Sequence, residues 1–105
     1  MTNKIVVLVT CESLRQARKI GQALVEAELV ACANLLNAPV DSLYRWKGRV
    51  RSEREFLMVL KTTRERFAAV AREIRRLHSY EVPEIIALPI ERGSRDYLNW
   101  VSQSV

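Results

Sequence analysis

Four side chains of this 105-residue chain are candidate ligands for a soft metal ion. Cys11, Cys32 and His78 carry strong donor atoms, and Met58 offers a weaker thioether. Thiolate and imidazole groups suit copper or zinc, so these residues are the first candidates for a metal site. Each also has a structural interpretation, because a histidine at a helix end favours the helix dipole and a buried cysteine packs as a small hydrophobe.

A second set of polar residues is expected to line a pocket for a small anionic molecule at a junction between subunits. The members of this predicted pocket are Lys61, Arg64, Tyr80, Glu81 and Glu84. The two cations would attract the ligand, with Arg95 as a further source of positive charge. The structural alternative is that Tyr80 anchors a turn while the carboxylates pair with those same cations.

Apolar periodicity predicts the elements that must position these side chains. The expected strands cover residues 4–10, 31–46 with a bend at 37–39, 50–62 and 85–90. The expected helices cover residues 13–28, 62–77 and 93–101, and S-x-x-Q and T-x-x-E capping boxes open the first two. The resulting order, βαββαβ with an additional C-terminal helix, is that of a ferredoxin-like α+β fold.

The topology separates the candidate metal ligands. In this fold the end of the first strand and the end of the second helix lie at the same edge, so Cys11 and His78 are expected to approach each other. Cys32 begins the second strand at the opposite edge, roughly 17 to 20 Å away. A single subunit therefore cannot bring all three residues to one metal ion.

The hairpin formed by the second and third strands is expected to project from the domain. Each strand would run about thirteen residues, roughly twice the usual length. The projecting part carries Leu43, Tyr44 and Trp46, and apolar side chains on such a ribbon indicate a partner surface. With no other partner in the chain, a second copy is the simplest one, so a homo-oligomer is predicted with these residues and Trp100 at its interface. A ligand cage built from the aromatic rings is the alternative.

Composition restricts the remaining possibilities. No Gly, Pro or Ser-rich linker divides the chain, which predicts one domain over residues 1–105. No apolar stretch reaches the roughly 20 residues of a membrane helix, and the N-terminal apolar run is too short for a signal sequence, so a cytoplasmic protein without membrane partners is expected. The net charge of +5 comes from interspersed charges on solvated faces. The third strand lacks the aromatic run of RNA-recognition modules, so no nucleic-acid partner is expected.

Several segments between residues 4 and 102 resemble one known family, and they read VVLVTCES, ALVEAELVACANLL, SLYRWKGRV, FLMVLKTTRERF, LHSYEVPEIIALPI and GSRDYLNWV. Their order and spacing are similar to those of the CutA divalent-cation-tolerance proteins. The resemblance implies a ferredoxin-like fold, similar to the PII signalling proteins, assembled as a tight homotrimer whose long hairpins pair across subunits. One position departs from the pattern: Ser79 stands where the family usually has proline.

The resemblance also implies what the chain does. Copper ligation has been proposed in the family for a cysteine at the end of strand one and two neighbouring histidines after helix two. Here His78 matches the second histidine, Leu77 replaces the first, and the cysteine position corresponds to Val9, with Cys11 two residues further on. The expected function is therefore tolerance of divalent metal ions by a trimer, with weak copper binding through His78 and Cys11.

Two further expectations complete this interpretation. The chain has no phosphate loop, nucleophile elbow or H-E-x-x-H motif, so an enzyme is not expected, nor is a metal or cofactor required for folding. The alternative function, of a different class, is a PII-like regulatory module that senses a small anionic ligand at the subunit clefts.

Overall fold

An antiparallel sheet forms the centre of the computed structural model, which describes residues 2–105. Strand β1 (Lys4–Cys11) lies between β4 (Arg49–Thr63) and β5 (Ile86–Pro89), and β2 (Cys32–Leu35) pairs with the other side of β4. The order β2-β4-β1-β5 is the ferredoxin-like order. The predicted α+β fold with an additional C-terminal helix is therefore confirmed.

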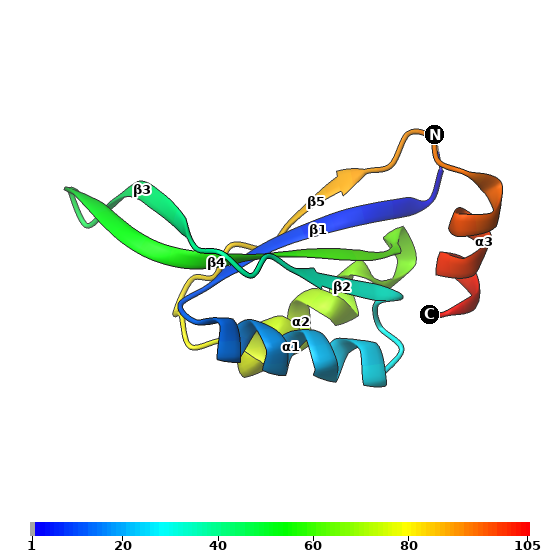
Figure 1. Ribbon diagram of the computed structural model, residues 1–105, viewed down its shortest axis with the longest axis horizontal. Coiled ribbons are helices and arrows are strands. Elements are labelled where there is room, and N and C mark those ends of the chain that lie inside the picture. Colours follow the sequence, from blue (N-terminus) through cyan, green and yellow to red (C-terminus); the bar gives the residue numbers. More distant parts are fainter. Residues whose placement is uncertain (1) are drawn as a thin grey trace.

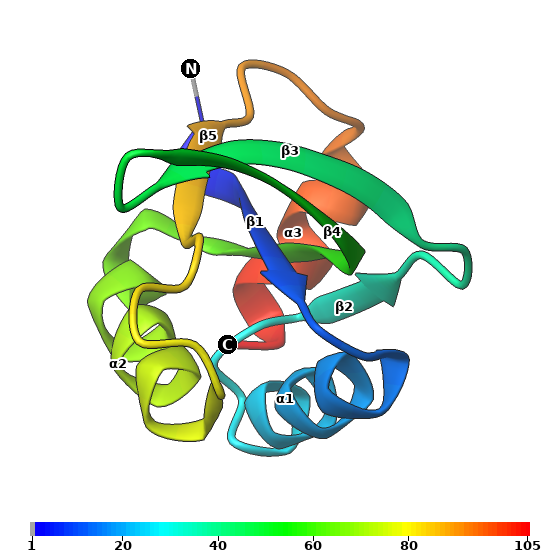
Figure 2. The ribbon, with the colours of Figure 1, turned by 90° about the vertical axis from the view of Figure 1, so that its left-hand side faces the viewer.

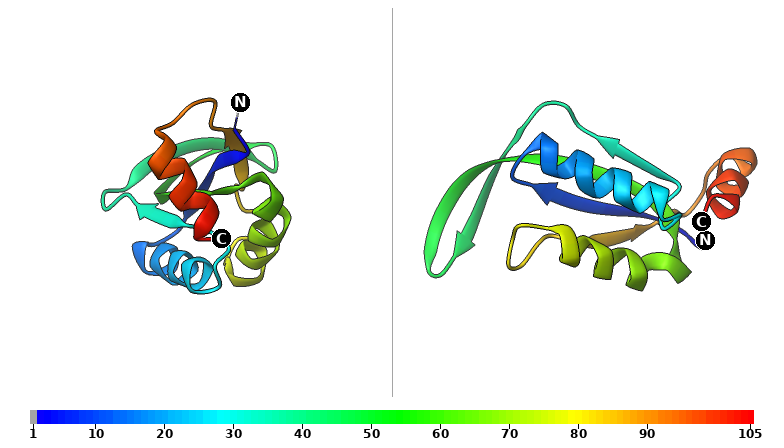
Figure 3. Two further views of the ribbon diagram at one scale, coloured as in Figure 1. Left: turned by 90° about the vertical axis from the view of Figure 1, so that its right-hand side faces the viewer. Right: turned by 90° about the horizontal axis from the view of Figure 1, so that it is seen from below.

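Two helices cover the same face of this sheet (Figures 1 and 2). They are α1 (Leu14–Glu26) and α2 (Phe67–Leu77), and a single 3-10 turn at Arg64–Arg66 leads into α2. The C-terminal helix α3 (Arg95–Gln103) packs at the end of the molecule opposite the hairpin (Figure 3). Within residues 2–105, none of the helices has the length and apolar character that crossing a bilayer requires.

Alternation along the central strands divides the apolar side chains between two faces of the sheet. Val7 and Val9 on β1 and Leu60 on β4 are fully buried against the two helices. The residues between them point to the opposite face, which the helices leave open, and are only half-buried: Val6, Leu8, Leu57 and Val59. The sheet therefore has one sealed apolar face and one that is partly exposed.

The long hairpin is present and projects well beyond the sheet (Figure 1). Strand β3 (Val40–Trp46) pairs with the first part of β4, from Val40 opposite Glu55 to Trp46 opposite Arg49. Lys47 and Gly48 form the turn with φ angles of +51° and +77°, a conformation that favours glycine. The bend at residues 37–39 divides the predicted second strand into β2 and β3, and the molecule extends 44 Å along its longest axis.

The two predicted capping boxes have different outcomes. At α1 the Ser13 hydroxyl accepts a hydrogen bond from the Gln16 backbone N–H at 3.1 Å, which confirms the first half of that box, while the Gln16 side chain accepts from the Ser79 hydroxyl at 2.9 Å. The predicted box at Thr62 is wrong, because β4 continues to Thr63 and α2 begins only at Phe67. Thr62 is fully buried, and its hydroxyl donates to the Leu29 carbonyl at 2.7 Å instead of capping a helix.

Candidate functional site

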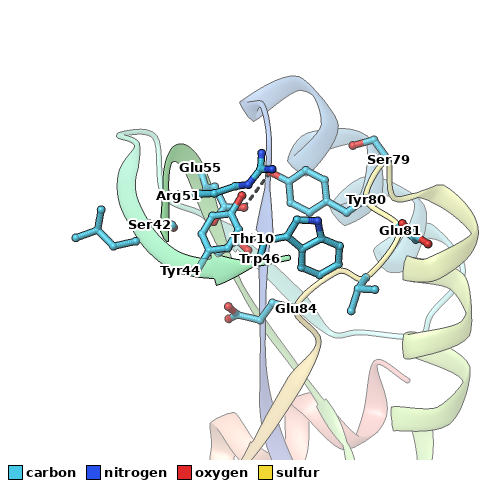
Figure 4. Close-up of a pocket in the computed structure, with 12 residues that line it drawn as sticks. Thr10, Ser42, Tyr44, Trp46, Arg51, Glu55, Ser79, Tyr80, Glu81 and Glu84 are labelled. Carbon is cyan, nitrogen blue, oxygen red and sulfur yellow. Dashed lines mark hydrogen bonds between the residues drawn. The ribbon is translucent and has the colours of Figure 1, made fainter. Parts of the chain in front are cut away.

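A cavity of about 690 Å³ opens between the hairpin and the turn that follows α2 (Figure 4). Tyr44 and Trp46 enter it from β3, Glu55 from β4, and Tyr80 and Glu84 from the segment between α2 and β5. Because the hairpin projects beyond the sheet at the end where the turn after α2 lies, segments far apart in the sequence meet here. The cavity is thus a direct consequence of the long hairpin.

A hydrogen bond connects the two sides of this cavity. The Tyr80 hydroxyl donates to a carboxylate oxygen of Glu55 at 2.9 Å (Figure 4). Only 8% of Glu55 is exposed, although it lies in the part of β4 that pairs with the hairpin strand β3. Burial, this hydrogen bond and the charge of Glu55 together raise the pKa of Tyr80 well above its ordinary value, so the phenol stays protonated and remains a donor.

Negative charge dominates the wall of the cavity. Glu81 and Glu84 join Glu55 there, and Arg51 is the cation among the lining residues. Partial burial, followed by the charge of Glu55, raises the pKa of Glu84 above its ordinary value of 4.5. Carboxylates gathered on one wall form an electronegative site, which attracts cations and repels anions.

His78 uses both of its ring nitrogens within the fold. Its Nδ1 accepts a hydrogen bond from the Tyr80 backbone N–H at 3.1 Å, and its Nε2 lies 2.8 Å from the Thr10 carbonyl oxygen. A backbone N–H is only a donor, so Nδ1 is unprotonated and Nε2 carries the proton that it donates to Thr10. The imidazole therefore holds the turn against the end of β1 and has no free lone pair for a metal ion.

Cys11 lies close to this turn but is sealed in the core. Its side chain is fully buried, and the thiol contacts the sulfur of Met58 at 3.6 Å. Burial, reinforced by the charges of Glu55 and Glu12, raises the pKa of the Cys11 thiol to about 12. A protonated thiol is a poor metal ligand, so Cys11 and His78 in this geometry do not fit a copper ion.

The predicted separation of Cys32 from this turn is confirmed. Cys11 pairs with Phe56 on β4 and Cys32 pairs with Lys61, a distance of 61 − 56 = 5 residues along that strand. Five residues of extended chain span roughly 17 Å. Across residues 2–105, no three or more His, Cys, Asp or Glu side chains form a group that could hold a metal ion.

The structure brings together only part of the predicted anion pocket. Tyr80, Glu81 and Glu84 line the cavity, but Lys61 and Arg64 do not. The Lys61 amine instead contacts the Asn34 side chain beside β2, and the Arg64 backbone N–H donates to the Asn3 carbonyl at 2.7 Å. Lys61 lies near the far end of β4 and Arg64 comes just after that strand, whereas the cavity residue Glu55 lies near its middle. The sequence alone did not show that this distance keeps both cations out of the cavity.

The residues predicted at the oligomer interface occupy two ends of the molecule. Leu43, Tyr44 and Trp46 are exposed on the hairpin, at 74%, 39% and 36%. Trp100 is 43% exposed on α3, where its ring centre lies 5.5 Å from that of Tyr97. Their role in assembly stays a prediction, but the structure shows that Tyr44 and Trp46 also line the cavity.

Sequence reasoning missed Glu55 as a site residue. The available signal was its spacing, because Glu55 lies two and four residues before Leu57 and Val59 and therefore on the same side of β4. A glutamate that merely faces solvent does not usually lie on the same side of a strand as a row of apolar residues. Its burial depends on Tyr80 and the hairpin, which only the tertiary structure brings to it.

Replacing Glu84 by Gln is expected to raise the free energy of unfolding at pH 7. The pKa of Glu84 is raised above 4.5 in the folded protein, so folding favours its protonated form. The unfolded chain then binds fewer protons in the interval above 4.5, and stability falls as the pH rises through it. Urea unfolding at pH 7, and again well below pH 4.5, measures the effect, which should disappear at the lower pH.

Glu91→Gln is the matched control for this prediction. Glu91 is exposed and does not line the cavity, so its replacement removes the same charge elsewhere on the surface. A stability gain of equal size at both pH values, or an equal gain in the control, would contradict a local effect at Glu84.

Comparison with known proteins identifies the family. The profile described as CutA1 divalent ion tolerance protein matches residues 5–104. The divalent-cation tolerance protein CutA of Thermus thermophilus is 44% identical over 99 residues, which cover 94% of this chain and 95% of that protein. The corresponding protein of Archaeoglobus fulgidus is 39% identical over 99 residues, again 94% and 95% of the two chains.

Solved structures agree with the sequence comparison. The structure of the periplasmic divalent cation tolerance protein CutA from Archaeoglobus fulgidus matches with a TM-score of 0.93 and 38% identity, covering 96% of this chain and 97% of that one. The Thermus thermophilus protein matches with a TM-score of 0.91 and 45% identity, over 93% and 94% of the two chains. The chain belongs to the CutA1 divalent ion tolerance protein family.

Proposed function

We propose that this chain acts in the tolerance of divalent metal ions as a homotrimer. Family membership supports the tolerance function, since relatives over nearly the whole chain carry that name. The structural observation that supports assembly is the apolar surface left on the open face of the sheet. Val6, Leu8 and Leu57 remain half-exposed there, and Leu43 is exposed further out on the hairpin. Surfaces of this kind mark protein interfaces.

The shape of the subunit suits a ring. A cyclic trimer needs two different surfaces on each subunit, one of which contacts the other on the next copy. The chain offers exposed apolar residues at both ends of its 44 Å length, on the hairpin and on α3. The edge strand β5 adds a third exposed element, with Ile86 and Leu88 each 49% exposed.

Sedimentation velocity at micromolar concentration is expected to show one species of three times 12.1 kDa. Leu43→Asp should dissociate it, because a carboxylate then replaces a 74% exposed leucine at the proposed contact. Val25→Asp on α1, where Val25 is 42% exposed on the helical face, is the control and should leave the trimer intact. A folded monomer of the unmodified chain, or equal dissociation by both variants, would refute this assembly.

Weak copper binding at His78 and Cys11 stays part of the proposal, with a structural condition. The turn at residues 78–80 must open to release the Nδ1 lone pair that the Tyr80 N–H occupies. The Cys11 thiol must also lose its proton, although burial raises its pKa to about 12. Both requirements reduce affinity, and neither residue is placed to hold copper as a permanent part of the fold.

Titration of the reduced, tag-free protein with Cu(I), Cu(II) and Zn(II) under a competing chelator tests this part. Saturable binding at one ion per subunit or per trimer should be lost in the His78→Ala, Cys11→Ser double variant, because the two proposed donors are then absent. Cys32→Ser is the control, since Cys32 on β2 pairs with Lys61, five residues along β4 from Phe56, the partner of Cys11. Binding that survives in the double variant would exclude these residues as the copper ligands.

The PII-like alternative lacks support from the cavity. An anionic ligand would face the carboxylates of Glu55, Glu81 and Glu84, while Lys61 and Arg64 lie outside the lining. We also propose that the chain binds rather than catalyses, because its single histidine holds the turn with both nitrogens. A cytoplasmic location is proposed from its two unpaired cysteines, which suit a reducing compartment.

A further inference from the structure

Two sets of three cations lie next to each other on the layer formed by α1 and α2. Each helix repeats them at positions i, i+3 and i+4, a spacing that places side chains on one side of a helix. The Ser79 hydroxyl donates to the Gln16 side chain at 2.9 Å, so the start of α1 adjoins the end of α2 (Figure 3). The six residues are all exposed, and we call them the basic patch: Arg15, Arg18, Lys19, Arg72, Arg75 and Arg76.

The basic patch accounts for the whole net charge of +5 of the chain. Glu73 lies among its residues on α2, and the Arg76 guanidinium binds that carboxylate at 2.7 Å. The rest of the chain is balanced, with 17 − 6 = 11 cations and 12 − 1 = 11 acidic residues. Within residues 2–105, no ion pair within 4.0 Å involves the other five cations of the patch. Folding thus gathers at one place a positive charge that is interspersed along the sequence.

Local forces in the helices oppose this arrangement. Like charges three and four residues apart destabilise a helix. The helix dipole also disfavours cations near the N-terminal end, yet Arg15 is the second residue of α1, whose first turn contains no acidic residue. The dipole favours Arg75 and Arg76 in the last turn of α2, but Arg72 lies outside that turn. Helix stability therefore does not account for the patch, and a bound polyanion would offset the repulsion within it.

We propose that the basic patch binds the phosphate backbone of double-stranded DNA without regard to base sequence. Five of its six cations are arginines, and a planar guanidinium group can donate two parallel hydrogen bonds to a phosphate. Helix α1 has 13 residues and is therefore about 20 Å long, while duplex DNA carries one charge per roughly 1.7 Å of its axis. Several phosphates can therefore contact the patch at once.

This surface is separate from the proposed subunit contacts. Those contacts are assigned to the hairpin, to α3 and to the open face of the sheet, whereas α1 and α2 cover the opposite face (Figures 1 and 2). DNA binding is therefore compatible with the trimer and goes beyond the proposed function. The aromatic run that is missing here belongs to the sheet surface of RNA-recognition modules, so its absence does not concern a helical surface.

An anionic membrane fits the basic patch less well than DNA. Helices that lie on a bilayer insert large apolar side chains beside their cations. Within residues 2–105, α2 has no exposed large apolar residue, and α1 has only Val25, which follows Lys19 by 25 − 19 = 6 residues. The patch thus offers charge without an apolar part that could enter a bilayer.

Fluorescence anisotropy at pH 7 with two labelled DNA duplexes of unrelated sequence tests the proposal. Binding should saturate with equal affinity for both duplexes. If the five unpaired cations each neutralise one phosphate, the log–log slope of affinity against salt is about −4.5, a loss of roughly 500-fold between about 50 and 200 mM. No saturable binding at the lower salt concentration overturns the proposal. Vesicles with phosphatidylserine that compete better than unlabelled duplex at equal charge concentration also overturn it, in favour of a membrane.

A charge-removing double variant locates the binding surface. Arg72→Gln combined with Arg75→Gln removes two cations of the patch, and glutamine favours a helix about as well as arginine does. The salt slope should become less steep by about two, and affinity should fall roughly tenfold. Circular dichroism and sedimentation establish that the variant folds and assembles as before. Arg15→Gln with Arg18→Gln replaces this pair where it does not fold.

The matched control is the double variant Arg92→Gln, Arg95→Gln. Both arginines are exposed and lie outside the patch, between β5 and the start of α3, so the same charge is removed elsewhere. The control should keep the salt slope of the unmodified chain. Equal losses of affinity and slope in the patch variant and in the control overturn the proposal.

A ¹H–¹⁵N spectrum supplies an independent readout of where DNA binds. Addition of the duplex should shift the backbone amide signals at the start of α1 and in the second half of α2. The hairpin also carries arginines, so the indole N–H signal of Trp46 reports on that competing surface, and the signal of Trp100 reports on α3. Both indole signals should stay in place, with each assigned by Trp→Phe substitution. Shifts confined to the hairpin or to α3 would place DNA elsewhere and overturn the proposal.

Discussion

The hydrogen bond from Tyr80 to Glu55 ties together the parts of the molecule that form the site. Strand β4 is continuous from Arg49 to Thr63, so its second half is fixed between β1 and β2 while its first half supports the hairpin. Glu55 lies where these halves meet. Tyr80 follows α2, and His78 anchors the same turn to the end of β1. The cavity exists because this bond joins the base of the hairpin to that turn.

The same arrangement explains why the donors expected to bind copper are engaged elsewhere. The Nδ1 lone pair of His78 accepts a hydrogen bond from the backbone N–H of Tyr80, and the Tyr80 hydroxyl donates to Glu55. Cys11 ends β1 beneath this network, where burial and the charge of Glu55 keep its thiol protonated. Residues with the chemistry of metal ligands thus act as structural parts of the turn. The polar groups that remain available to a ligand are the carboxylates on the cavity wall.

Much of this fold could be predicted because local signals decided it. The strand at residues 4–10, the cap at Ser13 and the bend at residues 37–39 each depend on a few neighbouring residues, and each was predicted correctly. The start of α2 was not, since Thr62 serves the core through Leu29, a residue 33 positions away. The burial of Glu55 and the positions of Lys61 and Arg64 likewise depend on strand register and hairpin curvature, which no local pattern encodes.

A double-mutant cycle on Glu55 and Tyr80 tests most directly whether this hydrogen bond joins the hairpin to the turn. The free energy of unfolding is measured in urea for the unmodified chain, Glu55→Ala, Tyr80→Phe and the double variant at one fixed protein concentration, because assembly contributes to stability. A direct bond to a buried carboxylate predicts a coupling energy of about 1 to 3 kcal/mol. Additive effects, with coupling near zero, would contradict the account.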